Sequence, residues 1–454
     1  MGKTIAAIAT PMAVGGISVI RISGEEALMI GDRIFKPVSG KPLSDYRGYT
    51  AAYGQVYQGK ELLDDGVATF FRAPKSYTGE DVVEISCHGG LLVTRQVLRA
   101  ALEAGAVMAE PGEFTRRAFL HGKMSLTQAE AVVDVIGAGS EQSLRAARSV
   151  MQGALYQKIR GILDQLLAVS SHLSAYIDYP EEGVEEVESD QLLDSCRSAL
   201  AQLKQLLSTF DQGRLIREGV ETVIVGRPNV GKSTLMNLLS GCQKSIVTDI
   251  PGTTRDVVEE TVQLGNVVLR LADTAGIRET DNPVEQMGVS MALERLETAG
   301  LILAVFDLSE PLTQEDQELI SRLRQMPAVA VLNKSDLPSK LDKQYLHDNF
   351  KQIVEISAGT SQGVEALSEA ITQLLSLTDL SGAGVWLQNE RQRDCARRAA
   401  ELLEEVCTTI EAGYTLDAVD VALDSALSAL MELSGEKVSD TVIDQVFSKF
   451  CVGK

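Results

Sequence analysis

The stretch Gly226-Arg227-Pro228-Asn229-Val230-Gly231-Lys232-Ser233 decides the fold of the middle of this chain. Its spacing is G-x-x-x-x-G-K-[ST], and it lies between an apolar run at 222–225 and a helix-forming run at 234–239. A strand, a glycine-rich turn and a helix in this order form a phosphate-binding loop, because the glycines let backbone amides approach phosphate oxygens. The residues predicted to contact the nucleotide here are Asn229, Val230, Gly231, Lys232, Ser233 and Thr234, with Lys232 at the β- and γ-phosphates and the Ser233 hydroxyl on Mg²⁺.

Outward from this loop, residues 220–377 alternate apolar strand candidates with helices, which is the α/β pattern. The strand candidates lie at 222–225, 267–271, 301–306, 329–332 and 354–356. We therefore expect one α/β domain over residues 216–379.

Three further motifs follow the ends of these strands. Asp273-Thr274-Ala275-Gly276 places a carboxylate near Mg²⁺ and a glycine amide near the γ-phosphate. Asn333-Lys334-Ser335-Asp336 places the Asp336 carboxylate where it can accept two hydrogen bonds from the N1–H and N2–H₂ edge of guanine, an edge that adenine lacks. Ser357-Ala358 offers a backbone amide to the guanine O6. The four motifs in this order predict a G domain that binds and hydrolyses GTP, with these residues among its nucleotide contacts.

The catalytic groups differ from those of many small GTPases. Ile277 stands where a glutamine commonly orients the attacking water, so another group must do so. Glu285 is the catalytic candidate, and an ordinary surface glutamate is the alternative. The candidate switch segment Thr248-Asp249-Ile250-Pro251-Gly252-Thr253-Thr254 supplies carbonyls that, with the Asn229 side chain, are suited to hold a monovalent cation against the phosphates.

The flanking regions have different patterns. Residues 1–118 mix short β-like runs with turns, including 17–22, 66–71 and 81–86, and the first residues form a short strand candidate. Two blocks at 119–215 and 380–454 show apolar stripes at helix spacing: Ile159, Ile162, Leu163, Leu166 and Leu167, then Cys395, Ala399, Leu402, Leu403, Val406 and Ile410. We expect a multidomain protein in which an α/β P-loop G domain is inserted in an all-α helical domain, preceded by an α+β domain.

Composition limits the function classes. The net charge of −21 argues against attraction of nucleic acid over the whole surface. The six cysteines show no CxxC spacing, which favours neither a disulfide framework nor a zinc site. No apolar stretch approaches the length of a membrane span, and no secretory leader is evident. These features predict a cytoplasmic protein without a membrane segment.

The motifs as a set resemble the bacterial tRNA-modification GTPase family MnmE (TrmE). The resemblance runs from Thr4-Ile5-Ala6-Ala7-Ile8-Ala9-Thr10-Pro11 to the terminal Phe450-Cys451-Val452-Gly453-Lys454, which is similar to the family's Phe-Cys-Ile-Gly-Lys ending. Gly252-Thr253-Thr254-Arg255-Asp256 and Asp273-Thr274-Ala275-Gly276-Ile277-Arg278 match its switch signatures.

The resemblance implies a homodimer with an N-terminal folate-binding and dimerisation domain, working with the flavoprotein MnmG (GidA), which carries the FAD. Together they would add an aminomethyl or carboxymethylaminomethyl group to the wobble uridine of certain tRNAs, using a one-carbon unit from a tetrahydrofolate derivative (5-formyl- or methylene-). The residues carried over are K⁺ ligands Asn229, Thr248, Ile250 and Thr253; Mg²⁺ ligands Ser233 and Thr254; folate contacts Arg21, Glu84, Lys123 and Lys454; and Glu285 as the acid that positions water when two G domains meet.

Several assignments stay open at this stage. Cys451 has either a functional thiol or a structural role, and His88 is either an acid/base group or a structural histidine beside a glycine turn. A regulatory GTPase, such as a ribosome-assembly factor, is the competing function, but no basic RNA-binding module is visible. A dimerisation scaffold with a vestigial nucleotide site is disfavoured by four intact motifs.

Overall fold

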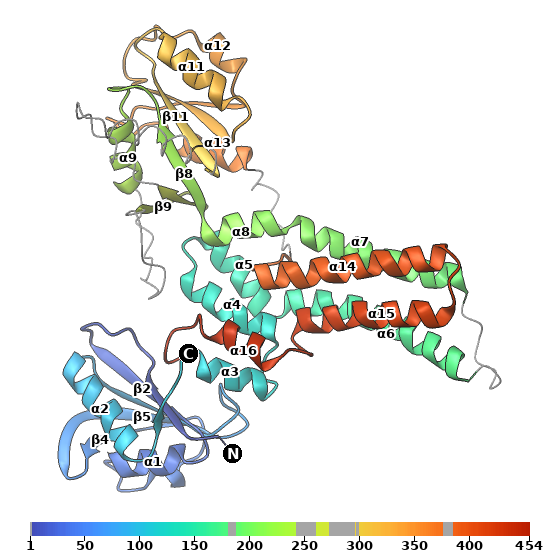
Figure 1. Cartoon of the computed structure of the whole chain (residues 1–454). Helices are drawn as coiled ribbons and strands as arrows, with labels where there is room; N and C mark the ends of the chain where they lie inside the picture. The colour runs from blue at the N-terminus through green and yellow to red at the C-terminus, as the bar shows by residue number, and fades with distance from the viewer. Residues whose placement is uncertain (1, 180–187, 242–259, 272–295, 297–298, 376–384) are drawn as a thin grey trace, which may run out of the picture. The chain divides into compact units, whose positions relative to one another are not determined.

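The computed structural model describes residues 2–179, 188–241, 260–271, 296, 299–375 and 385–454 (Figure 1). These residues divide into two compact units, Met1–Val133 with Met431–Lys454, and Asp134–Leu430. Within the described ranges, no helix combines the length and the apolar character that a membrane span requires.

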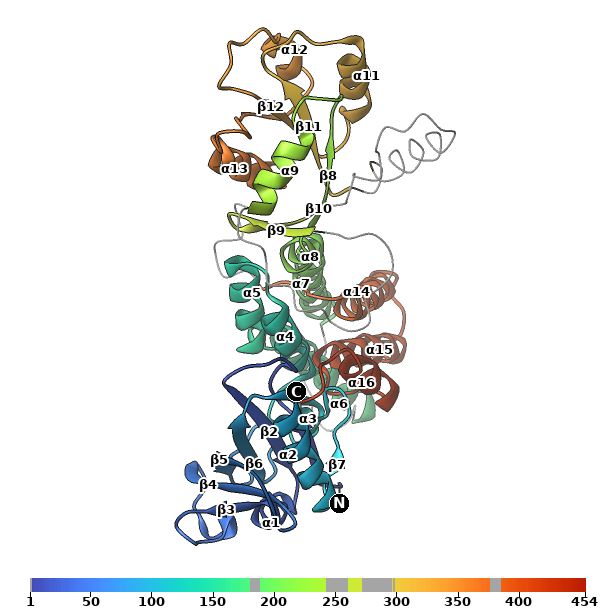
Figure 2. The same cartoon turned by 90° about the vertical axis from the view of Figure 1, so that its left-hand side faces the viewer.

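The first unit is built on a seven-stranded sheet in the order β3-β4-β5-β6-β2-β1-β7 (Figure 2). All neighbours are antiparallel except the parallel pair β1–β7. Helices α1 and α2 pack on it through buried residues such as Ile30 and Val97, which join Ile20, Ile22 and Ile85 of the strands in one core. The elements are β1 (Ile5–Ile8), β2 (Ile17–Ser23), α1 (Ala27–Ile34), β3 (Phe35–Pro37), η1 (Leu43–Asp45), β4 (Thr50–Gln58), β5 (Glu61–Phe71), β6 (Val82–His88), α2 (Leu91–Glu103) and β7 (Val107–Met108).

The end of the chain belongs to this same unit. Helix α16 (Asp440–Phe447) packs against α3 (Glu113–Leu120). Phe447 lies between two rings, with centroid distances of 6.3 Å to Phe119 and 5.2 Å to Phe450. Leu126, at the start of α4 (Leu126–Gly137), and Ile443 complete this small core. Residues far apart in the sequence therefore meet beside the sheet.

The helical part of the second unit confirms both predicted stripes. Ile159, Ile162, Leu163 and Leu166 are fully buried on α6, and Leu167 is half-buried. On α14, Cys395, Ala399, Leu403 and Val406 are buried, while Leu402 and Ile410 are half-buried. Helix α7 packs against both α6 and α14, as Figure 1 shows. The helices are α5 (Glu141–Met151), α6 (Ala154–Asp178), α7 (Ser189–Ser208), α8 (Phe210–Glu218), α14 (Glu390–Glu411) and α15 (Leu416–Ser434).

Among the described residues of the G domain in this unit, six strands form a sheet in the order β13-β12-β11-β8-β10-β9, and the β9–β10 pair alone is antiparallel. Alternate residues of β11 face opposite layers: Leu303 joins the core under α9 and α13, whereas Phe306 joins the core under α11 and α12. The elements are β8 (Val220–Val225), α9 (Lys232–Gly241), β9 (Glu260–Leu264), β10 (Val267–Leu271), β11 (Leu301–Asp307), α11 (Gln314–Leu323), β12 (Ala328–Asn333), α12 (Lys343–His347), β13 (Gln352–Glu355) and α13 (Val364–Leu374).

The predicted fold class is confirmed, with a G domain between helical segments and an α+β domain before them. The predicted strands all appear, and the last, expected at 354–356, is β13 at Gln352–Glu355. The sequence patterns predicted neither helices α1 and α2 nor strands β3, β4 and β9. The residue boundaries predicted for the domains stay a prediction.

Candidate functional site

The phosphate loop follows β8 at the edge where the parallel strands β8, β11 and β12 end. Its glycines adopt conformations that only glycine takes easily: φ is 149° at Gly226 and 99° at Gly231. A Cβ on Gly226 would lie 2.4 Å from the Val305 carbonyl oxygen, and one on Gly231 would lie 2.1 Å from Asn333 Nδ2. The loop is therefore shaped as a close-fitting backbone cradle.

Lys232 and Ser233 open helix α9 directly after this cradle. The Lys232 ammonium donates to the carbonyl oxygens of Gly226 at 2.7 Å and Arg227 at 2.9 Å. Ser233 and Thr234 are exposed, and Asn229 is exposed with φ 64°. The lysine thus lies against the phosphate loop, and the two hydroxyls are open to a ligand.

Asn333 joins the phosphate loop to the loop after β13. It is 2% exposed, its Nδ2 donates to the Val230 carbonyl at 2.9 Å, and its Oδ1 accepts from the Ala358 amide at 3.0 Å. The Ser357 hydroxyl donates to Asp336 Oδ1 at 2.6 Å. We call these segments, 333–336 and 357–358, the guanine-side loops. Three motifs that are separate in the sequence are thus brought into direct contact.

Asp307, at the end of β11, is a residue that sequence reasoning missed. It is 4% exposed and pairs with Lys334, whose Nζ lies 2.5 Å from its Oδ2. Burial would raise the pKa of Asp307, but hydrogen bonds from Lys334 and Ser309 hold that pKa below its ordinary value. The sequence offered one signal for Asp307, which is its position as the last residue of an apolar strand.

Arg227 is a second missed residue. Within the phosphate loop its guanidinium pairs with Glu310 and lies 3.4 Å from Asp316 Oδ2 at the start of α11. These contacts connect the phosphate loop with the segment after β11.

The other predicted nucleotide, Mg²⁺ and K⁺ residues lie outside the described residues. They are Thr248, Asp249, Ile250, Pro251, Gly252, Thr253, Thr254, Asp273, Thr274, Ala275 and Gly276. The catalytic candidate Glu285 and Ile277 lie outside the described residues as well.

A second group of polar residues lies in the first unit. Arg21 on β2 pairs with Glu84 on β6, with Nε 2.7 Å from Oε1, because these two residues face each other in the antiparallel register. The Arg21 guanidinium lies 5.6 Å from the Phe114 ring centroid and 5.9 Å from that of Tyr77. Burial raises the pKa of Tyr77, against the hydrogen bond to Thr115 and the charge of Arg21.

The last residues of the chain complete this group. Arg21 Nη1 donates to the Gly453 carbonyl at 3.2 Å, and the Phe114 amide donates to the Lys454 carbonyl at 3.2 Å. Burial and then the nearby Arg21 charge lower the pKa of Lys454, opposed by Glu84. We call Arg21, Tyr77, Glu84, Phe114 and Lys454 the Arg21 cluster. Three of the four residues predicted to contact folate, Arg21, Glu84 and Lys454, therefore lie together.

Lys123, the fourth predicted folate residue, donates to the Pro74 carbonyl at 2.9 Å, three residues from Tyr77. Cys451 is exposed, and its carbonyl accepts from the Gly112 amide at 3.4 Å. His88 is exposed, and Asp64 accepts from both its backbone amide at 2.8 Å and its ring Nδ1 at 2.7 Å. That hydrogen bond raises the pKa of His88. The roles considered for Cys451 and His88 stay predictions.

Known proteins resemble this chain over its whole length. A family described as "GTP-binding protein TrmE N-terminus" matches residues 4–123, and one described as "MnmE helical domain" matches residues 126–451. The tRNA modification GTPase MnmE of Symbiobacterium thermophilum is 44% identical, covering 100% of this chain and 99% of the relative. That of Geobacillus kaustophilus is 42% identical, covering 99% of each. The G domain of the T. maritima FeoB iron transporter is 24% identical over 34% of this chain and 98% of its own, with a TM-score of 0.26, too low to indicate a shared overall fold.

Proposed function

The chain belongs to the family of tRNA modification GTPases named MnmE, and from this membership we propose that its GTP hydrolysis serves modification of the wobble uridine of certain tRNAs. In this proposal the protein acts in the cytoplasm as a homodimer, with a flavoprotein of the MnmG (GidA) type that carries the FAD. An aminomethyl or carboxymethylaminomethyl group is added, and a tetrahydrofolate derivative supplies the one-carbon unit. The observation that carries the proposal is the meeting of the chain's last residues with Arg21 and Glu84, since a regulatory GTPase has no need of such a site.

The nucleotide part rests on the cradle and the guanine-side loops. Gly226 and Gly231 let the loop pack closely on Val305 and Asn333, and a loop of this conformation before a helix suits phosphate oxygens bound by backbone amides. Asp336, already oriented by Ser357, would accept from the guanine edge. The Ala358 amide, which donates to Asn333 Oδ1 in this structure, would turn to donate to O6 when guanine binds. Ser233 and Thr254 would hold Mg²⁺, which neutralises charge developing on the phosphates.

The cation part of the proposal concerns Asn229, Thr248, Ile250 and Thr253, of which the structure describes Asn229 alone. Asn229 is exposed in the phosphate loop, so its amide oxygen is available to K⁺. Glu285 would position the attacking water once two G domains associate. We expect faster hydrolysis in K⁺ than in Na⁺ at equal ionic strength, a K⁺ response lost in Asn229→Ala, and GTP binding without turnover in Glu285→Ala.

The folate part concerns Arg21, Glu84, Lys123 and Lys454. Arginine and lysine suit the carboxylates of a folate glutamate tail, and a carboxylate suits the amide edge of a pterin. The charges are compatible: the lowered pKa of Lys454 reflects a half-buried cation beside another cation, an arrangement that an anionic ligand would relieve. Calorimetry with a reduced folate should show binding that does not require GTP.

The deciding experiment is mass analysis of wobble uridines in cells that lack this protein. Loss of the modified uridine, restored by the unaltered gene and not by Asp336→Asn or Arg21→Gln, would support the proposal. An unchanged modification profile would refute it and favour the regulatory GTPase. Cys451→Ser in the same assay asks whether the exposed thiol takes part.

A further inference from the structure

The connection between β5 and β6, residues 72–81, is held by side chains from other segments. Lys123 donates to the Pro74 carbonyl, and the Tyr49 hydroxyl donates to the Lys75 carbonyl at 2.5 Å. The His121 ring Nδ1 lies 2.6 Å from the Thr78 carbonyl oxygen. The position of this connection therefore depends on side-chain contacts, and it includes Tyr77 of the Arg21 cluster.

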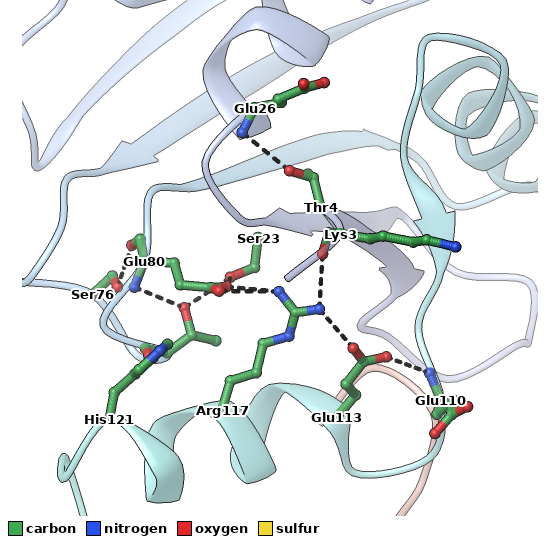
Figure 3. Close-up of polar contacts among 11 residues, drawn as sticks. Lys3, Thr4, Ser23, Glu26, Ser76, Glu80, Glu110, Glu113, Arg117 and His121 are labelled. Atoms are coloured by element: carbon green, nitrogen blue, oxygen red, sulfur yellow. Dashed lines mark hydrogen bonds and ion pairs between the residues drawn. The ribbon is translucent and has the colours of Figure 1, made fainter. Parts of the chain in front are cut away.

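Arg117 on α3 is the centre of a further group of contacts, which reaches the same connection through Glu80 (Figure 3). Its Nη1 donates to both carboxylate oxygens of Glu80 at 3.0 Å, and its Nη2 donates to Glu113 at 2.6 Å and to the Lys3 carbonyl at 2.9 Å. The side chain is 12% exposed, and those of Glu80 and Glu113 are 18% exposed. One guanidinium thus satisfies two largely buried carboxylates, which a lysine could not do with the same geometry.

The Glu80 carboxylate is also held by a residue of the sheet, Ser23 on β2. The Ser23 hydroxyl lies 2.7 Å from Glu80 Oε2 and 2.8 Å from the Thr78 hydroxyl, and both Ser23 and Thr78 are fully buried. Figure 3 shows the Glu80 carboxylate in contact with both Ser23 and Arg117. The turn at 78–80 is consequently attached to β2 and to α3 at once.

Tyr77 directly precedes this turn, and it is the residue of the 72–81 connection that belongs to the Arg21 cluster. Its hydroxyl bonds to the buried Thr115 of α3 at 3.0 Å, two residues before Arg117, and its ring lies beside the Arg21 guanidinium. The residue is 38% exposed, so part of the ring is open to a ligand. An aromatic surface beside a guanidinium is suited to a flat, anionic, ring-containing ligand.

We propose that the Arg117–Glu80 pair is a positioning device that sets the Tyr77 ring against Arg21, and that Tyr77 is a further ligand-contacting residue for the reduced folate. This inference rests on the folate part of the proposed function. Arg117 touches no ligand in this scheme; it acts through the 78–80 turn. Without the Arg117 guanidinium, the 78–80 turn and the Tyr77 ring would be able to move, while Arg21, Glu84 and Lys454 would stay in place.

Calorimetry with 5-formyltetrahydrofolate on the full-length protein tests this. Arg117→Lys should weaken binding by up to about tenfold, the factor expected when the aromatic contact of Tyr77 with the ligand is lost. Glu80→Gln, which keeps the shape of the side chain, should weaken it several-fold, and Tyr77→Leu should weaken it at least as much as Arg117→Lys. Arg99→Lys, in the exposed pair Arg99–Glu103 of the same unit, is the matched control and should change nothing. The circular dichroism spectrum at the assay temperature should be unchanged in all four variants, which shows that the unit carrying the substitutions is folded.

The double variant Arg117→Lys/Tyr77→Leu separates positioning from a general loss of structure. If Arg117 acts through Tyr77, the double variant should bind no more weakly than Tyr77→Leu alone. Additive losses would overturn the inference, as would unchanged affinity in Arg117→Lys and Glu80→Gln when the unaltered protein binds. No heat of binding from the unaltered protein would instead overturn the folate part of the proposed function, and this inference with it.

Discussion

The guanine-side loops and the Arg21 cluster are assembled in different ways. The guanine-side loops follow the ends of neighbouring parallel strands, so a short motif after each strand is enough to place its residues at one edge of the sheet. The Arg21 cluster draws on strands β2 and β6, the 72–81 connection, helix α3 and the last two residues of the chain. The first site can be read from local motifs, and the second depends on contacts across more than 430 positions, from Arg21 to Gly453.

This difference has an energetic counterpart. Asn333 holds the guanine-side loops through two backbone groups in a buried position, so little can move without leaving polar groups unpaired. The Arg21 cluster is held by side-chain charges and by a chain end, both of which tolerate displacement more easily. We therefore expect substitutions at the first site to affect GTP strongly, and those at the second to affect folate alone.

The largest effect is expected from Asp336→Asn. This change removes the carboxylate that accepts from the guanine N1–H and N2–H₂, so GTP affinity should fall about a hundredfold or more. Xanthine nucleotides should gain affinity, because a carbonyl replaces N2–H₂ there and can accept from the new amide. Fluorescent-nucleotide titration measures both, with exposed Asp348→Asn as control. Equal binding of ATP and GTP by the unaltered protein would refute the assignment.

Next in size is Asn333→Ala. It leaves the Val230 carbonyl and the Ala358 amide without these partners in a buried position, at a cost of about 1–3 kcal/mol for each group. We expect a lower urea midpoint, followed through the buried Trp386, which packs in the same core as Val220 and Leu303. GTP affinity should also fall about tenfold. Exposed Asn237→Ala should leave both unchanged, and a wild-type midpoint for Asn333→Ala would contradict the bridging role.

A smaller effect should appear at the other site with Gly453→Ala. Gly453 has φ 97°, and a Cβ there would lie 2.3 Å from the Ile8 carbonyl oxygen, so the terminal residues must shift away from Arg21. Reduced-folate affinity, measured by calorimetry, should fall several-fold while GTP affinity stays constant.

Gly413→Ala is the matched control for this substitution. Gly413 has φ 71° but nothing within 4 Å of its added Cβ, so it carries the same backbone strain without the clash. Folate binding should be unchanged in this variant. Equal losses in both variants would mean that strain, rather than displacement of the terminal residues, is responsible.

The sequence predicted the G domain well, because apolar runs of three to six residues indicate the strands and a motif of fixed spacing follows four of the five runs. It predicted Asn333, Asp336 and Ser357 as neighbours for the same reason. It missed Asp307, whose role comes from its pairing with Lys334 across adjacent strands. It also missed Arg117, since a basic residue in an amphipathic helix does not show which carboxylates it meets. Arg21 and Lys454 were available from family resemblance alone, because no local pattern joins position 21 to position 454.

The smallest effect concerns Asp307 and is a test of pH dependence. The folded-state pKa of Asp307 is depressed, so its contribution to stability is present above the ordinary carboxyl pKa and is lost as the pH falls through the folded value. Asp307→Asn should therefore lower the urea midpoint relative to the unaltered protein above about pH 5, and that difference should shrink as the pH falls below about 4. The effect should be modest, because the Lys334 side chain is 35% exposed and water screens the pair. The exposed control Asp348→Asn should show a difference that does not vary with pH. A difference for Asp307→Asn that stays constant from neutral to acid pH would show that the Lys334 contact does not stabilise the ionised carboxylate.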